Sequence, residues 1–554
     1  MEFISKPLNI VVMVAVLLIL GIAFMGLFGL CPPKGPWPMP PWCTKLSEEK
    51  VEKIEDVVQK QIEKLKPKPK EEFWKPFEQQ KPPVAKIIFI VKVPDCTPKG
   101  EPICLHIDLG RSIVMDYNGQ NMWVKELDFN IGTWRYSYAF SRACLGYETS
   151  EVVDINDSKY WWSKHKFVAD GDKVIRHTVK EWRWYPCGIT AHETFTNRPK
   201  FMEREIFMDG ASLIDFWWDW VFPVPDCNIL PNTARRLSEL GDYVNIFSVY
   251  TIEFDDSNVK VIKDGRVGYA YSEDNIRQEI RAMKKAGLTV NLLNTIWQEV
   301  DSEEYEKERS EEWWKQYNKE LHDYLTSIAR LAEEEGVNMM QVGYGSDSFL
   351  GFIEYTRHHP DYVMENWIKT IREVRKIFHG KLIYTYVLAG MADDPVFSRL
   401  DMLEPVIKEV DYVGISWWKG VTNNEDASLE ELIDGISYQL DTHIKPIYEK
   451  TGKKILLIPN IPSAKGGFTG KYKHDSPTVS PWRLPDDVPN DLNGQARFYE
   501  ALMRVVAKRP WIIGVMPWGY WRAELIDKSG NIRGKPAEKI LKEWFDLIKK
   551  QRSA

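Results

Sequence analysis

VMENWIKTIREVRKIFHGKLIYTYVL, residues 363–388, is the stretch that decides the fold of the larger part of this chain. Its first part repeats apolar side chains every three or four residues, which is typical of an amphipathic helix. Its last part, residues 381–388, is a short apolar run that follows a glycine and indicates a buried strand. A helix that leads directly into a buried strand is the repeating unit of α/β folds with a parallel sheet.

The same unit continues on both sides of this stretch. The predicted strands are LIDFWWDW, YVNIFSVYTI, TVNLLNTIW, VNMMQVGY, KLIYTYVL, DYVGISWW, KILLIPNI and WIIGVMPW, in that order. An amphipathic helical stretch follows each of them, the last one near KPAEKILKEWFDLIKK. Eight strands that alternate with helices predict a (β/α)8 TIM barrel, of the α/β class, over residues 211–550.

Residues 86–190 follow a different pattern, in which apolar and polar side chains alternate. The segments IIFIVKV, ICLHIDL, MWVKELDF, TWRYSYAF and KVIRHTVKEW have this period of two, and turn residues separate them. Segments of this kind are typical of half-buried strands. We therefore expect a small β-sandwich module in front of the barrel.

The first 30 residues are predicted to be a transmembrane signal anchor. Residues 8–30 contain no charged side chain and are about as long as a helix that crosses the hydrocarbon core. A cleaved signal peptide would have a shorter apolar stretch. This predicts a single-pass protein of the cell membrane, held there by residues 8–30, with the bulk of the chain extracellular.

Residues 31–85 are predicted to be a proline-rich linker with one amphipathic stalk helix. Ser47 is placed to cap this helix, with Glu48 and Glu49 in its first turn. The apolar stripe of the helix consists of Val51, Ile54, Val58, Ile62 and Leu65. Such a narrow stripe fits either docking on the barrel or a stalk that forms a homo-oligomer, and the sequence does not choose between them.

Seven cysteines occur in the chain, and an extracellular location would allow them to form disulfides. They are Cys31, Cys43, Cys96, Cys104, Cys144, Cys187 and Cys227. Cys96 and Cys104 flank the turn TPKGEPI and are the first predicted pair, with Cys144 and Cys187 as the second. None forms a C-x-x-C motif, so no zinc site is predicted, and the odd number leaves one unpaired thiol or an intermolecular bond.

The composition excludes some functions and favours another. The formal net charge of -7 gives no basic excess for phosphates, so no nucleic-acid partner is expected. The 23 tryptophans fit either surfaces that stack on sugar rings or the aromatic core of a large barrel. Helices rich in glutamate and lysine are typical of a thermophile's surface.

The predicted β-module resembles starch-binding carbohydrate-binding modules. The resemblance rests on VPDCTPKGEPICLHI at its start, on NMWVKEL and GTWRYSYAF, and on VKEWRWYP at its end. It implies that some tryptophans of the module are platforms for sugar rings. The candidates are Trp123, Trp161, Trp162, Trp182 and Trp184.

The predicted barrel resembles the clan A glycoside hydrolases. The stretches that carry this resemblance are WWKQYNKELHDYLTSIARLAEEEGVNMMQVGYG, MENWIKTIREVRKIFHGKLIYTY and DLNGQARFYEALMRVVAKRPWIIGVMPWGYW. They are most similar to the family that contains β-mannanases with a VGTEL fourth strand. The resemblance implies two catalytic glutamates, an acid/base at the end of the fourth strand and a nucleophile at the end of the seventh.

The chain departs from that pattern at both strand ends. Gly345 stands where the acid/base of VGTEL is expected, and Ile458-Pro459-Asn460 provides no carboxylate at the end of the seventh strand. Glycine, proline and asparagine cannot transfer a proton as a carboxylic acid does, and they cannot form a glycosyl ester. Other acids near predicted strand ends are Asp347, Glu299 and Glu524. They are weak catalytic candidates, because loops are rich in solvated acids, and Asp347 is the nearest to the lost acid/base.

Aromatic residues are retained at the predicted strand ends, where they would line a glycan cleft or fill the barrel core. The candidates for glycan binding are Trp217, Trp297, Tyr344, Trp417, Trp418, Trp518 and Trp521, with Trp123 in the module. Trp518 fits the aromatic platform that clan A enzymes place after the eighth strand. No metal or organic cofactor is implied.

Three functions agree with these observations. The first is a polysaccharide-binding protein with a degenerate glycosidase barrel, which explains lost glutamates beside retained aromatics. The second is an active glycoside hydrolase that uses relocated carboxylates. The third is a structural component of the cell surface. A fold alone does not decide among them, because function depends on the site.

Overall fold

The computed structural model describes most of the chain from residue 83 to residue 553. It leaves out residues 1–82, 99–100, 109–110, 143–149, 153–163, 184–192, 214–228, 255–258, 263–271, 297–309, 345–359, 389–399, 472–487, 521–527 and 554. The predicted anchor, stalk helix and nearly all of the predicted linker therefore lie outside the described residues. The predicted boundary at residue 85 is slightly late, because the first strand of the next part already begins at Val84. No helix within the described ranges is both long and apolar enough to span a membrane.

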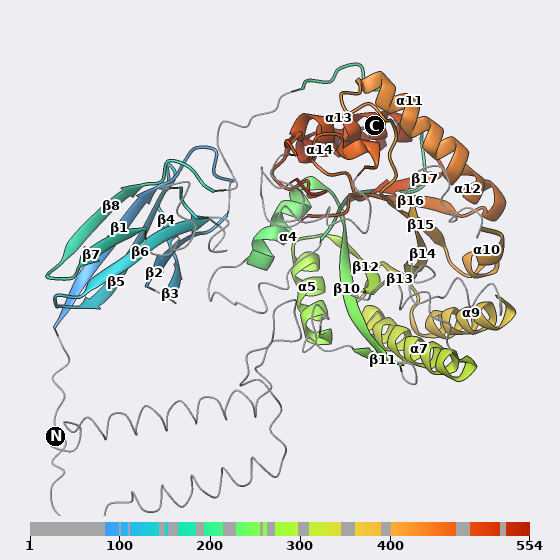
Figure 1. The fold of residues 1–554 in the computed structure, drawn as a ribbon, viewed down its shortest axis with the longest axis horizontal. Helices are drawn as coiled ribbons and strands as arrows, with labels where there is room; N and C mark the ends of the chain where they lie inside the picture. The colour runs from blue at the N-terminus through green and yellow to red at the C-terminus, as the bar shows by residue number, and fades with distance from the viewer. Residues whose placement is uncertain are drawn as a thin grey trace, which may run out of the picture. The chain divides into compact units, whose positions relative to one another are not determined.

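The larger part of the described chain is a closed barrel of eight parallel strands (Figure 1). The barrel strands are β9 (Met208–Ser212), β10 (Tyr243–Phe254), β12 (Thr289–Ile296), β13 (Met339–Tyr344), β14 (Lys381–Leu388), β15 (Tyr412–Trp417), β16 (Lys454–Pro459) and β17 (Ile512–Val515). Each pairs in parallel with the next, and β9 pairs with both β17 and β10, which closes the ring. A further strand, β11 (Val259–Ile262), extends β10 as an antiparallel hairpin. The predicted TIM barrel is confirmed.

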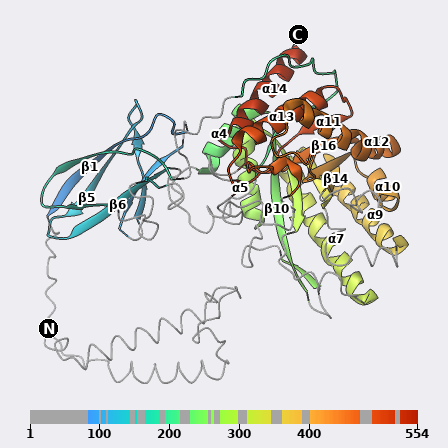
Figure 2. The ribbon, with the colours of Figure 1, turned by 45° about the horizontal axis from the view of Figure 1, so that its top comes forward.

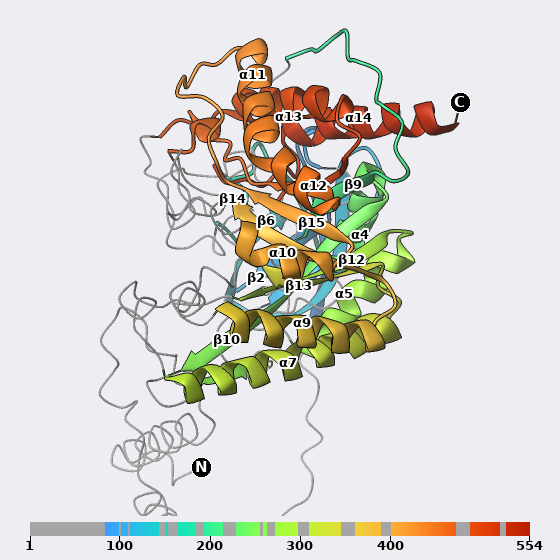
Figure 3. The same ribbon diagram turned by 90° about the vertical axis from the view of Figure 1, so that its right-hand side faces the viewer.

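Helices alternate with the strands and surround the sheet (Figure 3). They are α4 (Ile229–Leu240), α5 (Glu273–Lys285), α7 (Glu311–Glu334), α9 (Pro360–Ile377), α10 (Leu400–Lys408), α11 (Leu429–Gln439), α12 (Lys445–Thr451), α13 (Leu492–Ala507) and α14 (Pro536–Ser553). Serine side chains cap α5, α7 and α11, because Ser272, Ser310 and Ser428 each accept a bond from a backbone N–H in the first turn.

The first barrel strand lies before the segment that the sequence suggested. The strand that precedes β10 in the barrel is Met208–Ser212, with the sequence MDGAS. Of the predicted run LIDFWWDW, residues 213–220, only Leu213 is described, and it lies just after this strand. Every residue of β9 is buried, and a Cβ atom at Gly210 would lie 1.8 Å from the carbonyl oxygen of Tyr243. The close approach of β10 therefore requires small residues, which hide the usual apolar signal of a strand. The barrel begins slightly earlier than residue 211.

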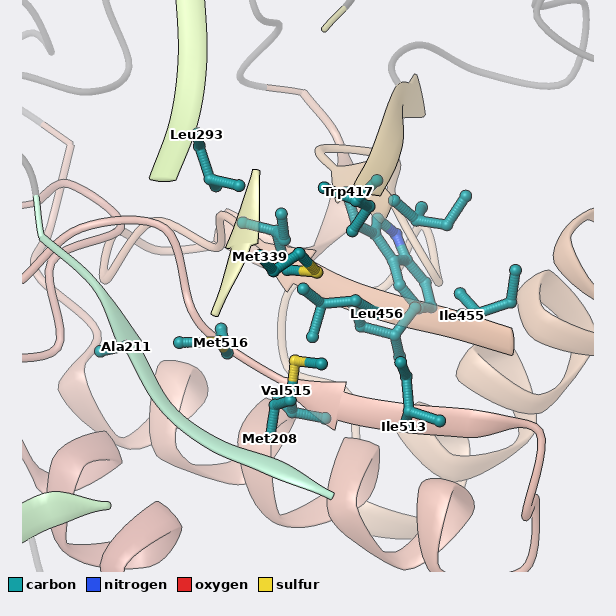
Figure 4. Close-up of a cluster of buried hydrophobic side chains, with 14 of the residues drawn as sticks. Met208, Ala211, Leu293, Met339, Trp417, Ile455, Leu456, Ile513, Val515 and Met516 are labelled. Atoms are coloured by element: carbon teal, nitrogen blue, oxygen red, sulfur yellow. The ribbon is translucent and has the colours of Figure 1, made fainter. Parts of the chain in front are cut away.

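The barrel and its helices share one continuous hydrophobic core. Figure 4 shows part of it, in which Met208, Met339 and Met516 lie among aliphatic side chains such as Leu293 and Leu456. Met208 and Met516 are fully buried. Flexible thioethers fill the irregular interior of a small barrel well, so methionines from several strands occupy its centre.

A row of side-chain amides crosses this apolar interior. Asn338 donates to Asn291 at 2.9 Å, Asn291 donates to Asn245 at 3.0 Å, and Asn245 donates to the hydroxyl of Ser212 at 3.0 Å. Asn291, Asn245 and Ser212 are completely buried. Sequence analysis missed this row, although the repeated Val-Asn pair in YVNIF, TVNLL and VNMM is its visible signal.

Two four-stranded sheets precede the barrel in the chain (Figure 2). One contains, in spatial order, β4 (Asp116–Tyr117), β5 (Met122–Asn130), β1 (Val84–Lys92) and β8 (Lys173–Thr178). The other contains β3 (Arg111–Val114), β2 (Ile103–Ile107), β6 (Arg135–Arg142) and β7 (His165–Val168). Buried residues of both sheets belong to one apolar cluster. We call residues 83–183 the β-module.

One buried carboxylate of the β-module is surrounded by arginines. Glu101, which is 2% exposed, binds Arg142 at 2.9 Å and Arg533 at 3.3 Å, and Arg236 lies at 3.9 Å. Burial by itself raises the pKa of Glu101, but the charges of Arg142, Arg533 and Arg236 outweigh it and hold the pKa below its ordinary value. Glu101 is therefore ionised, and it compensates buried guanidinium groups.

Cys96 and Cys104 are both disulfide-bonded. That they pair with each other stays a prediction, and so does the pair formed by Cys144 and Cys187, which lies outside the described residues.

Candidate functional site

The carboxyl ends of the barrel strands meet at one rim, because all of them run in parallel. In (β/α)8 barrels the active site occupies this rim. The described side chains at the rim come from the residues that follow β15, β16 and β17, namely Trp418, Asn460 and Trp518. The ring of Phe247, in β10, contacts that of Trp518.

Trp518 is the central aromatic residue of this rim. Its backbone N–H donates to the carbonyl of Pro459 at 2.8 Å, and it forms a parallel bridge with Ser212, so the end of the barrel fixes its backbone. Its ring meets Phe247 at a centroid distance of 4.7 Å and Trp418 at 6.2 Å, with interplanar angles of 62° and 57°. The tilted neighbours support the edges of the indole, which is partly exposed.

Gly519 separates Trp518 from a tyrosine that turns away from the rim. Its φ of 102° lies in the region that L residues avoid, so this position requires glycine. Tyr520 is fully buried and donates from its hydroxyl to Glu538 at 2.5 Å. Of the two described aromatic residues of this loop, Trp518 is therefore the one that lies at the rim.

The two tryptophans that end β15 have different surroundings. Trp417 is completely buried, meets Phe498 of α13 at 6.3 Å, and donates from its indole nitrogen to the carbonyl of Lys419 at 2.8 Å. It has no exposed face for a sugar ring, and we leave it out of the candidate site. Trp418 is 7% exposed, donates to the hydroxyl of Ser416 at 3.0 Å, and contacts Trp518.

Asn460 immediately follows β16, at the end of the seventh barrel strand, where the resemblance to clan A enzymes implies the nucleophile. Its backbone N–H donates to the carbonyl of Trp417 at 2.9 Å. Its side chain is 1% exposed, and neither its amide oxygen nor its amide nitrogen has a hydrogen-bond partner among the described residues. A buried amide without partners costs free energy.

Two loops support the rim beside Asn460 through buried polar contacts. Lys535, 2% exposed, donates to the hydroxyl of Ser463 at 3.0 Å and to the carbonyl of Ser529 at 3.4 Å. Gln495 of α13 donates to the carbonyl of Ile461 at 2.8 Å. These contacts hold the loop after β16 and the loop that precedes α14 against each other.

Several predicted site residues lie outside the described residues. The weak catalytic candidates Asp347, Glu299 and Glu524 are among them, as are Gly345 and the aromatic residues Trp217, Trp297 and Trp521. Tyr344 is the last residue of β13, as expected from the strand prediction. No carboxylate occurs among the described residues that lie within two positions after β15, β16 or β17. The described residues of this part of the rim therefore offer the aromatic face of Trp518, a kind of surface on which sugar rings stack.

The β-module exposes aromatic side chains of its own. Trp123 of β5 is half-buried, and its ring meets that of Tyr117 at 5.1 Å. Tyr117 is 60% exposed, and Trp134, in the loop before β6, is 67% exposed. Trp182 is completely buried and donates to the hydroxyl of Thr97 at 2.9 Å, so it belongs to the core. Trp161, Trp162 and Trp184 lie outside the described residues.

One family model and several solved structures are similar to this chain. The model of glycoside hydrolase family 113 matches residues 233–535, more than half of the chain. A solved GH113 β-mannanase, AaManA from Alicyclobacillus acidocaldarius in complex with ManMIm, is 20% identical with a TM-score of 0.45 over 62% of this chain and 99% of that chain. Xylanase 10B from Thermotoga petrophila in complex with xylobiose is 15% identical with a TM-score of 0.36 over 65% and 99%. No curated protein matches the chain.

Proposed function

The chain belongs to glycoside hydrolase family 113 and carries the clan A barrel, and on this premise we propose that it is a polysaccharide-binding protein without the two-glutamate mechanism. In this proposal the rim around Trp518 binds a glycan, and hydrolysis by the retaining route is absent or very weak. The observation that carries the proposal is Asn460, a buried amide directly after β16.

The chemistry of Asn460 supports the loss of the retaining mechanism. That mechanism needs two carboxyl groups about 5–5.5 Å apart, one of which forms a covalent ester with the sugar. A carboxamide neither forms this ester nor exchanges a proton near neutral pH. Gly345 at the position expected for the acid/base supports the same proposal, in which both catalytic groups of the family pattern are lost.

The rim keeps what binding requires. The exposed part of Trp518 gives a flat apolar surface for a sugar ring, and Phe247 and Trp418 fix its orientation in advance. Because the backbone of Trp518 is bound to Pro459, little conformational freedom is lost when a ligand stacks on it.

We propose a second glycan surface on the β-module, in agreement with its resemblance to starch-binding modules. The exposed ring of Tyr117, braced by Trp123, and the exposed ring of Trp134 are the described aromatic groups that reach solvent there. Two weak sites on one chain raise the overall affinity for a long polymer, because the second binding event becomes intramolecular.

We also propose that residues 8–30 anchor the protein in the cell membrane with both glycan surfaces outside. The support is the uncharged apolar run in the sequence. Protease added to intact cells should release the β-module and the barrel. Complete protection of both would contradict this topology.

The central experiment separates binding from hydrolysis. Affinity electrophoresis in gels with mannan, starch or another glucan measures binding, and the release of reducing ends measures hydrolysis. We expect binding to at least one polysaccharide, weakened about tenfold or more by Trp518→Ala, which corresponds to about 1.4 kcal/mol. Tyr438→Ala is the matched control, because Tyr438 is an exposed aromatic residue of α11.

Hydrolysis would decide against the proposal. If the unmodified protein turns over a glycan rapidly and Asp347→Asn abolishes the activity, the protein is an active hydrolase with a relocated catalytic acid. If no polysaccharide binds and Trp518→Ala changes nothing, the rim is not a glycan site.

A further inference from the structure

Three side chains of the β-module come together at a place that is separate from the candidate glycan site of the barrel. Glu151 forms an isolated bridge with Trp182, His165 begins β7, and His177 belongs to β8. β7 and β8 are edge strands of the two different sheets. The cluster therefore joins the edges of both sheets at one point.

The two imidazoles point at the same carboxylate. The Nε2 atom of His165 lies 3.0 Å from Oε1 of Glu151, and the Nε2 atom of His177 lies 2.6 Å from Oε2. The centroids of the two imidazole rings are 4.3 Å apart. One ligand atom from each residue can be chosen so that all three atoms lie within 4.8 Å of one another.

The surroundings hold these groups in place. The backbone N–H of Phe140 donates to Oε1 of Glu151 at 3.0 Å, and the carboxylate is 2% exposed. The ring of His177 stacks on Phe140 at 5.1 Å, and the ring of His165 meets Tyr138 at 5.0 Å. Ligands that neighbouring contacts orient in advance bind a metal ion more tightly than mobile ones.

We propose that Glu151, His165 and His177 bind a divalent transition-metal ion, with Zn²⁺ as the best fit. Two imidazole nitrogens and one carboxylate oxygen are ligands that Zn²⁺ accepts in a four-coordinate site. The fourth position goes to water, because the side chains of His165 and His177 are 21% and 19% exposed. Each imidazole binds the metal in its neutral form, with the ring proton on Nδ1.

A third histidine close by does not belong to the set. The two ring nitrogens of His106 lie 2.8 Å from the hydroxyl of Ser112 and 2.5 Å from that of Ser141, so both are engaged. His106 is also 3% exposed. The ion would instead link the edges of the two sheets, and this role is independent of glycan binding at Trp518.

Calorimetric titration of the full-length chain with Zn²⁺, after dialysis against a chelator, tests the proposal. We expect one equivalent to bind. The double variant His165→Gln/His177→Gln should bind it at least about 10–100-fold more weakly, since each lost ligand weakens a metal site strongly. Glutamine keeps a donor for Glu151 and so preserves the hydrogen bonds. His379→Gln is the matched control, because His379 is an exposed histidine paired with Glu333 on the barrel.

If the double variant and the unmodified chain bind Zn²⁺ with equal affinity, the proposal is wrong. Glu151, His165 and His177 would then form only a hydrogen-bonded cluster. The visible spectrum of Co²⁺ bound to the unmodified chain gives a second measurement that does not depend on any variant. Strong d–d bands are expected from a four-coordinate site with imidazole ligands. A spectrum like that of aqueous Co²⁺ would exclude the site, whatever the variants do.

Discussion

The amide oxygen of Asn460 lies directly against the backbone of Gly530. A Cβ atom added at Gly530 would be 1.8 Å from Oδ1 of Asn460. The loop before α14 therefore passes over the end of β16 with no room for a side chain. This contact fixes the orientation of the amide that stands at the expected place of the nucleophile.

Gly530→Ala should destabilise the barrel and disturb the rim. The added methyl group must displace Asn460 or the loop, and overpacking of this kind costs about 1–3 kcal/mol. Urea unfolding followed by tryptophan fluorescence measures the loss. Gly171→Ala is the control, because a Cβ at Gly171 meets no atom within 4 Å. If both variants are equally stable, Asn460 or the loop moves aside for the added methyl group at little cost in free energy.

Asp209→Asn should stabilise the protein at neutral pH. Burial, followed by the charge of Asp242, raises the pKa of Asp209 to about 6. Between its ordinary pKa and pH 6 the folded state holds a proton that the unfolded state has lost, so stability falls as pH rises through this window. The expected gain at pH 7 is about 2–3 kcal/mol, at 1.36 kcal/mol per pKa unit, and it disappears near pH 3.

The same unfolding measurement at several pH values tests this prediction. Lys549, which lies 3.6 Å from Asp209, keeps its contact with Asp242 at 2.6 Å in the variant. A stability difference that does not change with pH would contradict the raised pKa of Asp209.

Glu101→Gln should be strongly destabilising. The change removes the negative charge that compensates Arg142 and Arg533, whose side chains are 0% and 6% exposed. Removal of one partner from a buried ion pair costs about 3–5 kcal/mol. Glu126→Gln is the control, since Glu126 pairs with Lys86 and both side chains are 52% exposed. There we expect at most about 1 kcal/mol. If Glu101→Gln lowers the stability by a similarly small amount, water must reach the buried arginines around Glu101.

Cys96 and Cys104 should form one intramolecular disulfide. Peptide mapping without a reductant should recover the two cysteines in a single linked peptide. A short loop of this size stabilises the folded chain by about 2–3 kcal/mol, so reduction should lower the midpoint of unfolding. Recovery of Cys96 linked to any other cysteine would contradict the prediction.

The regular part of the fold could be predicted from the sequence because its signals are local. The strand predicted at residues 381–388 coincides with β14. The first strand was misplaced because the close approach of β10 at Gly210 requires small residues, while the apolar run after it suggested a longer strand. The position of this strand depends on packing between segments that are distant in the chain, and a local sequence pattern does not report such packing.

The site could be predicted only in part, for the same reason. Asn460 was placed correctly at the end of a strand, because strand ends follow from the apolar pattern. Trp417 contacts α13, whereas Trp418 contacts Trp518. The apolar pattern shows that both residues end a strand, but it does not show to which side each ring points. The cluster of Glu151, His165 and His177 was missed because its members have no motif spacing and come from two sheets.

The meeting of β7 and β8 at Glu151 also bears on the solubility of the β-module. Edge strands present free backbone groups that invite pairing with another chain, and charged side chains discourage it. β7 exposes Lys166, and β8 exposes Lys173 and Arg176. Two like-charged edges held side by side repel a second copy of the module. A protein concentrated on a polysaccharide surface would therefore resist aggregation through these edges.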